Sequence, residues 1–297
     1  MLTLLYRFRF WFLSALLLAA GAGGCAAIDS WQRQTIFSPQ PAPQRWWREA
    51  PAGTEVFDLA VGGNETVRAW YWASPLPDAP TVLYLHGARW NLNGSVFRLE
   101  AWTRLGYSVL AIDYRGFGDS SARLPSEQSA LQDAGVALQE LARRQPDPAR
   151  RFVYGHSLGG AIAIGLLSEP ARPPVAGLIV ESSFSSIADM MTLYRWGRLP
   201  GASWLVTQPF DSARKLANLS TPLLLLHGTS DQVVPHAMSD VLYAAAVAVP
   251  AGLKRLVKLD GVSHSGAVRA GSSYSEAVTR FIQDASQAYR PARMAGR

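Results

Sequence analysis

Residues 153–161 read VYGHSLGGA and place a single serine, Ser157, among glycines. The apolar run that ends at Tyr154 has the character of a buried strand, in which glycine loses packing and costs conformational entropy. A sharp turn from a strand into a helix does need small neighbours, because the turn lifts the serine oxygen out of the sheet. The stretch therefore predicts a nucleophile elbow at Ser157, with a purely structural glycine turn as the alternative.

Strand-like and helical stretches alternate on both sides of this turn. The clearest helical stretch is 126–144, where apolar residues recur at steps of three and four from Leu131 to Leu141. Ser129 and Gln132 fit a capping box near its start. Strand-like runs are expected at Glu55–Val61, Thr66–Trp72, Thr81–His86, Ser108–Asp113, Arg151–Tyr154, Gly177–Glu181, Pro222–His227 and Arg255–Leu259.

This alternation predicts the α/β class. Continuous apolar runs such as TPLLLL, residues 221–226, are typical of strands buried on both faces of a mainly parallel sheet. We expect eight strands flanked by helices, with the first two strands as an antiparallel hairpin at one edge. Ligands of such sheets bind at the carboxyl ends of the strands, so candidate site residues are sought there.

A serine hydroxyl is a weak nucleophile that needs a base, and the base needs an acid to orient it. Of the five histidines, His264 in LDGVSHSG follows the last strand on a loop long enough to reach Ser157. The others have structural interpretations: His86 and His227 shape turns, His156 lies inside the elbow and His236 begins a helix. His264 is therefore the predicted base.

Asp231 is the predicted acid, because HGTSDQVVP places it four residues past a strand end and between Ser157 and His264 in the chain. Glu181, at the end of the preceding strand, is the rival acid, and a surface-turn aspartate is the structural alternative. The oxyanion of the reaction also needs N–H donors. We expect the backbone N–H groups of Leu158 and Ala88 to supply them.

The N-terminal region predicts export. Residues 1–24 carry two arginines, an apolar stretch and small residues directly before Cys25, the single cysteine. This layout resembles a bacterial lipoprotein signal, in which Cys25 would be lipidated; a cleaved secretory signal and an uncleaved span through Ile28 are the alternatives. Residues 25–54 are expected to form a tether or extended arm that packs on the body through its tryptophans.

Composition narrows the function classes. The 297 residues are 48% hydrophobic and 17% charged, with a formal net charge of +6. The basic residues form no run, which argues against nucleic-acid binding, whereas a mildly basic surface favours an anionic bilayer. One cysteine excludes an intramolecular disulfide and a thiolate metal cluster. We expect neither a metal nor an organic cofactor, and no oligomeric state is predicted.

The motifs LYLHGARWN, DYRGFGDS, GHSLGG, HGTSDQVVP and GVSHSG resemble the successive motifs of the α/β-hydrolase superfamily. SFSSIADM and PFDSARKLANLSTPLLLLHG are similar to the branch that contains membrane-associated lysophospholipases, monoacylglycerol lipases and protein depalmitoylases. The resemblance covers residues 55–290, which leaves 291–297 as a tail. It implies the α/β-hydrolase fold, Ser157 as nucleophile, Asp231 as acid, His264 as base, and Ala88 with Leu158 as oxyanion donors.

Two features bear on the substrate. Many branch members have an asparagine directly after the first His-Gly, where this chain has Ala88-Arg89-Trp90; Arg89 and Trp90 are expected to narrow the acyl pocket or contact a head group. The apolar segment 187–215, with Met191 and Trp204, is interpreted either as a short cap over the serine or as a helix with a surface loop.

These observations predict an exported serine hydrolase, anchored in the membrane of the cell envelope as a lipoprotein. It would cleave carboxylic ester or thioester bonds of acyl or lipid-like substrates through an acyl-enzyme. A peptidase or amidase using the same triad is one alternative, because the triad does not select among acyl groups. A non-catalytic envelope lipoprotein that uses the fold as a binding scaffold is the other.

Overall fold

The computed structural model describes residues 24–40 and 47–289. The predicted leader, up to residue 23, and the predicted tail lie outside the described residues. Across the part that is described, none of the helices combines the length and the apolar character needed to cross a membrane.

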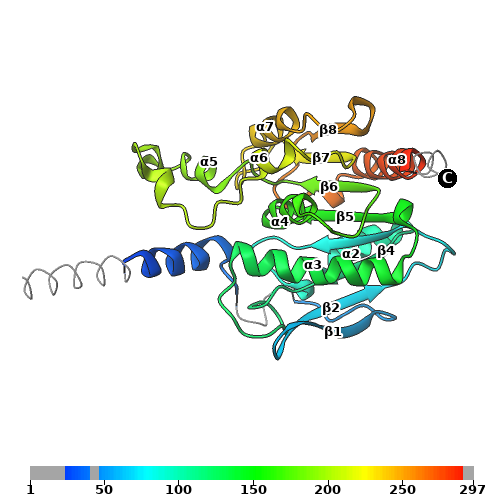
Figure 1. Ribbon diagram of the computed structural model, residues 1–297. Helices are drawn as coiled ribbons and strands as arrows, with labels where there is room; N and C mark the ends of the chain where they lie inside the picture. The colour runs from blue at the N-terminus through cyan, green and yellow to red at the C-terminus, as the bar shows by residue number, and fades with distance from the viewer. Residues whose placement is uncertain (1–23, 41–46, 290–297) are drawn as a thin grey trace, which may run out of the picture.

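An eight-stranded sheet organises the chain (Figure 1). The strand order is β1-β2-β4-β3-β5-β6-β7-β8; β1 runs antiparallel to β2 and β2 to β4, and all other neighbours are parallel. All eight predicted strands and the edge hairpin are thereby confirmed. The strands are β1 Glu55–Gly62, β2 Glu65–Trp72, β3 Thr81–Leu85, β4 Ser108–Ile112, β5 Arg151–His156, β6 Gly177–Glu181, β7 Leu223–Gly228 and β8 Lys254–Leu259.

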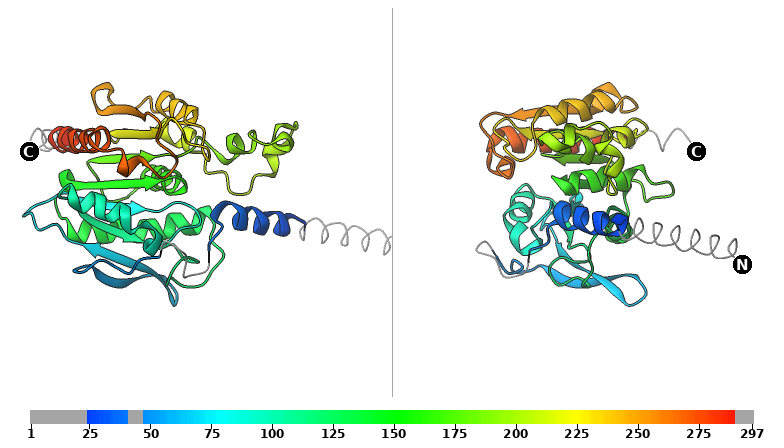
Figure 2. Two further views of the ribbon diagram at one scale, coloured as in Figure 1. Left: turned by 180° about the vertical axis from the view of Figure 1, so that it is seen from behind. Right: turned by 90° about the vertical axis from the view of Figure 1, so that its left-hand side faces the viewer.

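Helices cover both faces of the sheet (Figure 2), so each face has its own hydrophobic core. One core contains side chains of α3 (Glu127–Arg144), α4 (Leu158–Ser168), α6 (Ser212–Leu216) and α7 (Ala237–Ala245). The other contains side chains of α2 (Leu92–Arg104) and α8 (Ser272–Tyr289). Shorter elements connect them: α5 Ile187–Met191, η1 Pro148–Arg150, η2 Arg195–Arg198, η3 Ala202–Leu205, η4 Ala251–Leu253 and η5 Ala267–Arg269.

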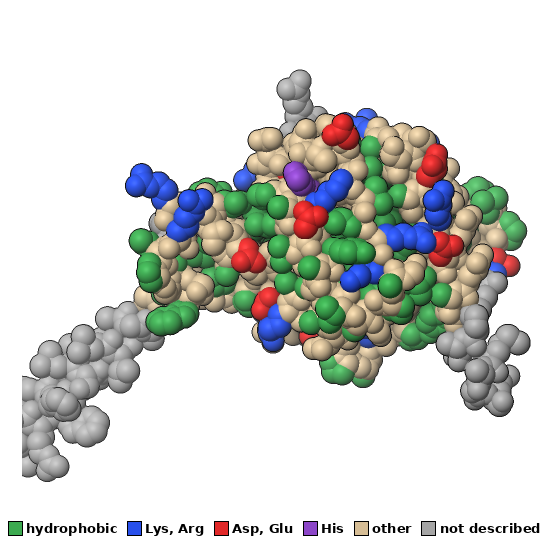
Figure 3. Space-filling view, turned by 90° about the horizontal axis from the view of Figure 1, so that it is seen from above, with side chains coloured by type: hydrophobic (Ala, Val, Ile, Leu, Met, Phe, Trp, Pro, Cys, Tyr) green, Lys and Arg blue, Asp and Glu red, His purple; other side chains and the backbone are tan. Residues whose placement is uncertain are grey.

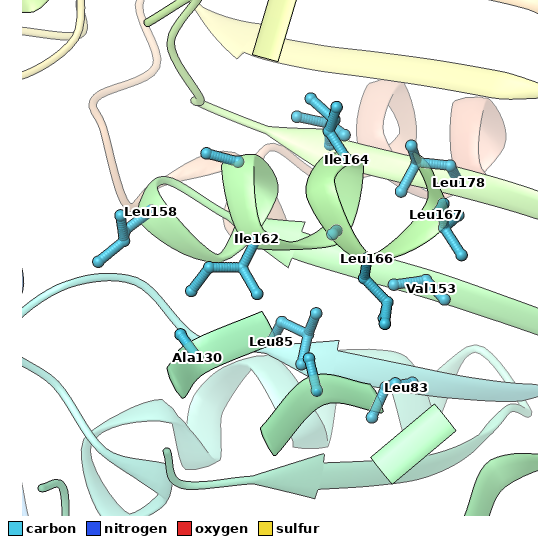
Figure 4. Close-up of a cluster of buried hydrophobic side chains, with 14 of the residues drawn as sticks. Leu83, Leu85, Ala130, Val153, Leu158, Ile162, Ile164, Leu166, Leu167 and Leu178 are labelled. Carbon is cyan, nitrogen blue, oxygen red and sulfur yellow. The ribbon is translucent and has the colours of Figure 1, made fainter. Parts of the chain in front are cut away.

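The helix α4 lies at the centre of the first core. Ile162 and Leu166 extend from it towards Leu83 and Leu85 of β3 (Figure 4). Every residue of α4 except its last is buried. Burying side chains of this size contributes about 1.5–3 kcal/mol each relative to leaving them exposed. The core therefore holds the first residue of α4 in a fixed place at the carboxyl edge of the sheet.

The predicted helix 126–144 is confirmed as α3, but its cap is one turn earlier than expected. The side chain of Ser126 accepts a hydrogen bond of 3.1 Å from the N–H of Ser129, and the Ser129 side chain accepts one of 2.8 Å from the N–H of Ser126. Gln132, predicted to complete the box, instead accepts a hydrogen bond from Arg115. A serine replaces the usual Glu or Gln of the capping box, which is why the pattern misplaced it.

The expectation of an extended arm after Cys25 is wrong for its first part, because residues 24–37 are helical. This helix is held by Gln32 and Phe37, which are buried, whereas Trp31 is 54% exposed. The Phe37 ring packs between Phe117 and Phe210, with centroid distances of 6.5 and 5.9 Å. Contacts to residues far along the chain stabilise the helix, and composition alone does not reveal such contacts.

Candidate active site

Ser157 occupies a strained turn between β5 and α4. Its φ of 55° and ψ of −120° are unusual for a residue other than glycine. The neighbouring glycines are required by close approach: a Cβ at Gly155 would overlap the carbonyl oxygen of Gly159, and a Cβ at Gly159 would overlap that of Leu85. Of the two interpretations given to the stretch, the turn geometry is the one expected of a nucleophile elbow.

The structure brings Ser157, His264 and Asp231 into one hydrogen-bonded chain. Nε2 of His264 lies 3.0 Å from Oγ of Ser157, and Nδ1 of His264 lies 2.8 Å from Oδ2 of Asp231. The carboxylate accepts from Nδ1–H, which leaves Nε2 as the acceptor that faces the serine hydroxyl. These three side chains come from the ends of β5, β7 and β8, which share one edge of the sheet.

Asp231 is buried, yet it is held in its ionised form. Its Oδ1 accepts from the N–H groups of Val233 and Val234 at 2.8 and 2.9 Å. Burial alone would raise the pKa of Asp231, but hydrogen bonds with His227 and His264 and from these N–H groups hold the pKa well below its ordinary value. A negative carboxylate therefore faces His264 across the neutral pH range.

Two histidines expected to be structural contact this group directly. Nε2 of His227 lies 3.1 Å from Oδ2 of Asp231, so His227 is a second donor to the same carboxylate. Nε2 of His156 lies 3.0 Å from the carbonyl oxygen of His264. Burial, with Arg98 adding to it, lowers the pKa of His156 well below its ordinary value, so His156 is neutral and donates this bond. The spacing of HGTSD, with Asp231 four residues after His227, is the only sequence signal for the first contact.

Glu181, the rival acid, is engaged elsewhere. Its carboxylate is fully buried and accepts hydrogen bonds from Arg98 at 2.5 Å and from the Tyr154 hydroxyl at 2.6 Å. Of the two carboxylates weighed from the sequence, Asp231 is the one hydrogen-bonded to His264. Glu181 and Arg98 instead form a buried ion pair beneath the elbow.

The two predicted oxyanion donors belong to the start of α4 and to the loop after β3. Leu158 is the first residue of α4, where backbone N–H groups are left without helical acceptors. The loop of Ala88 touches the elbow, because a Cβ at Gly87 would lie 3.2 Å from Cβ of Ser157. Arg89 has a φ of 70°, and its N–H donates a hydrogen bond of 2.9 Å to the carbonyl oxygen of Phe37. The N-terminal helix thus fixes the loop that carries Ala88.

Of the four predicted pocket residues, Trp90 alone borders the cavity of about 320 Å³ beside the loop of His264. Arg89 is exposed, Met191 is partly buried at the end of α5, and Trp204 is 90% exposed. Trp204 therefore points into solvent and does not line a pocket with Trp90. The cavity is bordered by Trp47, Arg48, Trp90, Asn93, Gly94, Val96, Phe97, Ser265 and Arg269.

Metal-ligating side chains do not gather in the described ranges, which contain no group of three or more His, Cys, Asp or Glu that could hold an ion. The candidate site brings together the serine and its two hydrogen-bonded partners. Such a set supports nucleophilic attack on an acyl carbon.

Comparison with known proteins agrees with this geometry. The sequence profile of the serine aminopeptidase family S33 matches residues 77–214. A Mycobacterium tuberculosis protein without an assigned function is 33% identical over 283 residues, which cover 91% of this chain and 94% of that protein. The rat lysophosphatidylserine lipase ABHD12 is 33% identical over 223 residues, which cover 69% of this chain and 51% of the lipase.

Solved structures show the same fold. An esterase from Pyrococcus furiosus superposes with a TM-score of 0.64 at 19% sequence identity, covering 83% of this chain and 97% of the esterase. A Thermus thermophilus protein superposes with a TM-score of 0.58 at 25% identity, covering 78% of this chain and 97% of that protein. At such identities the likeness concerns the fold.

Proposed function

The chain belongs to the α/β-hydrolase superfamily of serine hydrolases, and on this premise we propose that it hydrolyses carboxylic esters or thioesters of acyl substrates with Ser157 as nucleophile. The observation that carries the proposal is the continuous hydrogen-bonded chain from Ser157 through His264 to Asp231, with distances of 3.0 and 2.8 Å. Ester hydrolysis is the reaction that an activated serine performs when water follows the leaving group into the site.

In the first half-reaction, Oγ of Ser157 attacks the acyl carbon while Nε2 of His264 takes the hydroxyl proton. The carbonyl electron pair moves onto oxygen, and the N–H groups of Ala88 and Leu158 stabilise that negative charge. Each donor of this kind contributes about 3 kcal/mol to the transition state, by analogy with measured losses. Collapse of the intermediate breaks the bond to the leaving oxygen or sulfur, which receives the proton from His264.

In the second half-reaction, water attacks the acyl-enzyme while Nε2 of His264 takes a proton from it. The new intermediate collapses, Oγ of Ser157 regains the proton, and the carboxylic acid leaves. Asp231 stays ionised throughout and keeps the imidazole in the tautomer whose Nε2 accepts. His227 and the N–H groups of Val233 and Val234 hold the Asp231 carboxylate in place.

Acyl substrates are favoured over peptides for two reasons. A relative with 33% identity is a lysophosphatidylserine lipase, so this sequence lineage includes an enzyme that acts on a lysolipid. The cavity beside the loop of His264 is also bordered by three aromatic side chains, Trp47, Trp90 and Phe97. The aromatic part of this lining suits the apolar part of a substrate, while Arg48 and Arg269 also border the cavity.

The test is a substrate panel with the purified protein. We expect p-nitrophenyl esters and acyl thioesters of increasing chain length to be cleaved, with kcat/KM at least a hundredfold above that for aminoacyl p-nitroanilides. Because the matching family is described as serine aminopeptidase, S33, the alternative outcome is a higher kcat/KM for the anilides than for the esters. A preference for the anilides would replace the ester hydrolase by an aminopeptidase on the same site, and no turnover of either class would favour the binding scaffold.

Membrane attachment through Cys25 forms part of the proposal and has its own test. Cys25 is exposed and lies in the helical stretch 24–37. A lipid on Cys25 would tether the enzyme in the cell envelope. Metabolic labelling with a fatty acid should mark the wild type and not Cys25→Ser; equal labelling of both would exclude this anchor.

A further inference from the structure

Two segments far apart in the sequence form a lobe on one side of the molecule (Figures 1 and 2). One is the helix 24–37, and the other is the stretch 190–208, which contains η2 and η3. Gln32 joins them by donating to the carbonyl oxygen of Leu205 at 2.6 Å and accepting from the N–H of Thr207 at 2.9 Å. Gln208 adds a hydrogen bond of 2.8 Å to Asp29. These hydrogen bonds hold the two segments together.

The lobe is rich in exposed apolar side chains. Of the twelve large apolar side chains that are exposed in the described residues, seven lie on the lobe, with exposed fractions from 37% for Ile28 to 90% for Trp204. Monomeric soluble proteins rarely concentrate exposed apolar side chains in this way unless the patch binds something. We call these residues the lobe surface: Ile28, Trp31, Leu193, Tyr194, Leu199, Trp204 and Leu205.

The outer end of the lobe carries positive charge. Arg195 and Arg198 are exposed there, and no aspartate or glutamate occurs between Met190 and Phe210. On the neighbouring helix, Asp29 is engaged by Gln208 and Arg33. Figure 3 shows basic side chains at the outer end of the lobe and hydrophobic side chains along it. Tryptophan, tyrosine and arginine around aliphatic side chains are typical of surfaces that enter the head-group region of a bilayer.

We propose that the lobe surface docks onto an anionic lipid bilayer and turns the carboxyl edge of the sheet, with Ser157, towards the membrane. The sequence supports this occupant: the described residues of the lobe helix, 24–37, directly follow a leader whose residues 10–20 form an apolar stretch. The second segment leaves the sheet after β6, at the same edge that carries Ser157. Docking would therefore bring membrane-borne acyl substrates to the site. The delivery of substrates to Ser157 rests on the proposed ester hydrolysis, whereas the docking of the lobe surface onto the bilayer does not.

The direct test is quenching of tryptophan fluorescence by brominated lipids. The full chain is added to vesicles of phosphatidylcholine and phosphatidylglycerol that contain dibrominated phosphatidylcholine, and wild type is compared with Trp204→Phe. We expect Trp204 to account for a measurable share of the quenching. Trp72, at the end of β2 on the opposite edge of the sheet, is the matched control, and Trp72→Phe should leave the quenching unchanged. Equal quenching in wild type and Trp204→Phe would overturn the docking.

Variants then connect docking with activity. We expect the double variant Leu199→Ser/Trp204→Ser to hydrolyse a long-chain ester presented in vesicles at least tenfold more slowly, with an unchanged rate on a soluble short-chain ester. The control Val247→Ser alters an exposed apolar side chain between α7 and β8, outside the two segments of the lobe. It should change neither rate. If the vesicle rate of the double variant is unchanged, the lobe surface serves a protein partner or a second copy instead, and the proposal fails.

The two arginines give an electrostatic check. Each basic residue near an anionic surface contributes about 1 kcal/mol, so Arg195→Gln/Arg198→Gln should weaken vesicle binding about 25-fold. The loss should shrink in high salt and vanish on vesicles of phosphatidylcholine alone. An equal loss on neutral vesicles would contradict charge-assisted docking. Absence of all ester hydrolysis with Trp204 quenching retained would refute the proposed function and leave docking intact.

Discussion

The backbone N–H of Arg89 donates a hydrogen bond of 2.9 Å to the carbonyl oxygen of Phe37. This bond joins the end of the N-terminal helix to the loop that carries Ala88, one of the two proposed oxyanion donors. The Phe37 ring is fully buried between Phe117 and Phe210, so the carbonyl group has little freedom to move. The N-terminal helix is therefore part of the site as well as part of the lobe.

Phe37→Ala should weaken both the fold and the site. Removing a buried phenylalanine costs about 3–5 kcal/mol, and the segment that presents the carbonyl oxygen to Arg89 loses its anchor. We expect a lower unfolding midpoint in urea and a fall in kcat with a smaller change in KM. Phe37→Leu, which keeps most of the apolar volume, is the control. Its unfolding midpoint and its kcat should lie between those of wild type and Phe37→Ala. Full kcat in a folded Phe37→Ala protein would show that the loop is held by other contacts.

The two buried carboxylates should differ sharply when neutralised. Asp231→Asn removes the charge that orients His264, and we expect kcat to fall about ten-thousandfold, by analogy with the same change in a serine protease. Glu181→Gln disturbs the pair with Arg98 beneath the elbow, and we expect lower stability with kcat within about tenfold of wild type. Steady-state kinetics and urea unfolding of both variants provide the measurement. The reverse ranking of the two kcat values would assign the role of acid to Glu181.

His156 should act through His264. His156→Leu removes the donor to the His264 carbonyl oxygen, a bond that contributes about 1 kcal/mol, so the loop carrying the imidazole becomes less ordered. We expect kcat to fall several-fold while KM is nearly constant, and His156→Gln, whose amide can donate the same bond, to recover part of the loss. A pH profile unchanged in shape would accompany this positioning role. Equal kcat in wild type and His156→Leu would rule it out.

Stability should fall from about pH 6.5 to pH 8 because of Asp113. Burial raises the pKa of Asp113 to about 8 from 3.8 and lowers the pKa of His86 to about 4 from 6.5. Between pH 3.8 and about pH 8 the folded state keeps a proton on Asp113 that the unfolded state has lost, so the free energy of unfolding falls as pH rises. His86 has the opposite effect below pH 6.5, where the unfolded state binds the extra proton. Above pH 6.5 the effect of His86 has ended, and that of Asp113 continues up to about pH 8.

Asp113→Asn tests this sign directly, since the amide oxygen can still accept the 2.8 Å hydrogen bond from the N–H of Leu92. Urea unfolding at pH 6.5 and pH 8 should show a decline for wild type and a flatter response for the variant. All other groups are common to both proteins, so the difference reports Asp113. Parallel pH responses would mean that Asp113 is ionised in the folded state.

The sequence predicted the sheet well because each strand can be recognised from its own local pattern of residues. The four leucines at 223–226 form a continuous apolar run, and a sheet covered on both faces buries all of them. The elbow was equally visible, since Gly155 and Gly159 are explained by backbone contacts around Ser157. The alternation of elements also placed His264 and Asp231 at the same edge, where the structure has them hydrogen-bonded.

What escaped prediction depends on contacts between distant parts of the chain. The helix 24–37 is held by residues beyond position 110, such as Phe117 and Phe210, and no local period marks it. The bond from His156 to the His264 carbonyl oxygen spans 108 positions. Trp204 was expected near the substrate because it is apolar and follows β6, yet its side chain is exposed on the lobe. The sequence pattern shows that a residue is apolar, but it does not show which distant residue packs against it.

The central claim is that Ser157 is a nucleophile activated by His264, and labelling with a fluorophosphonate probe tests it most directly. Such probes form a covalent bond only with an activated serine, so they need no knowledge of the natural substrate. We predict labelling of the folded wild type, none of Ser157→Ala, and labelling slowed by several orders of magnitude in His264→Ala. A folded wild type that does not react, or a Ser157→Ala protein that still does, would contradict the account.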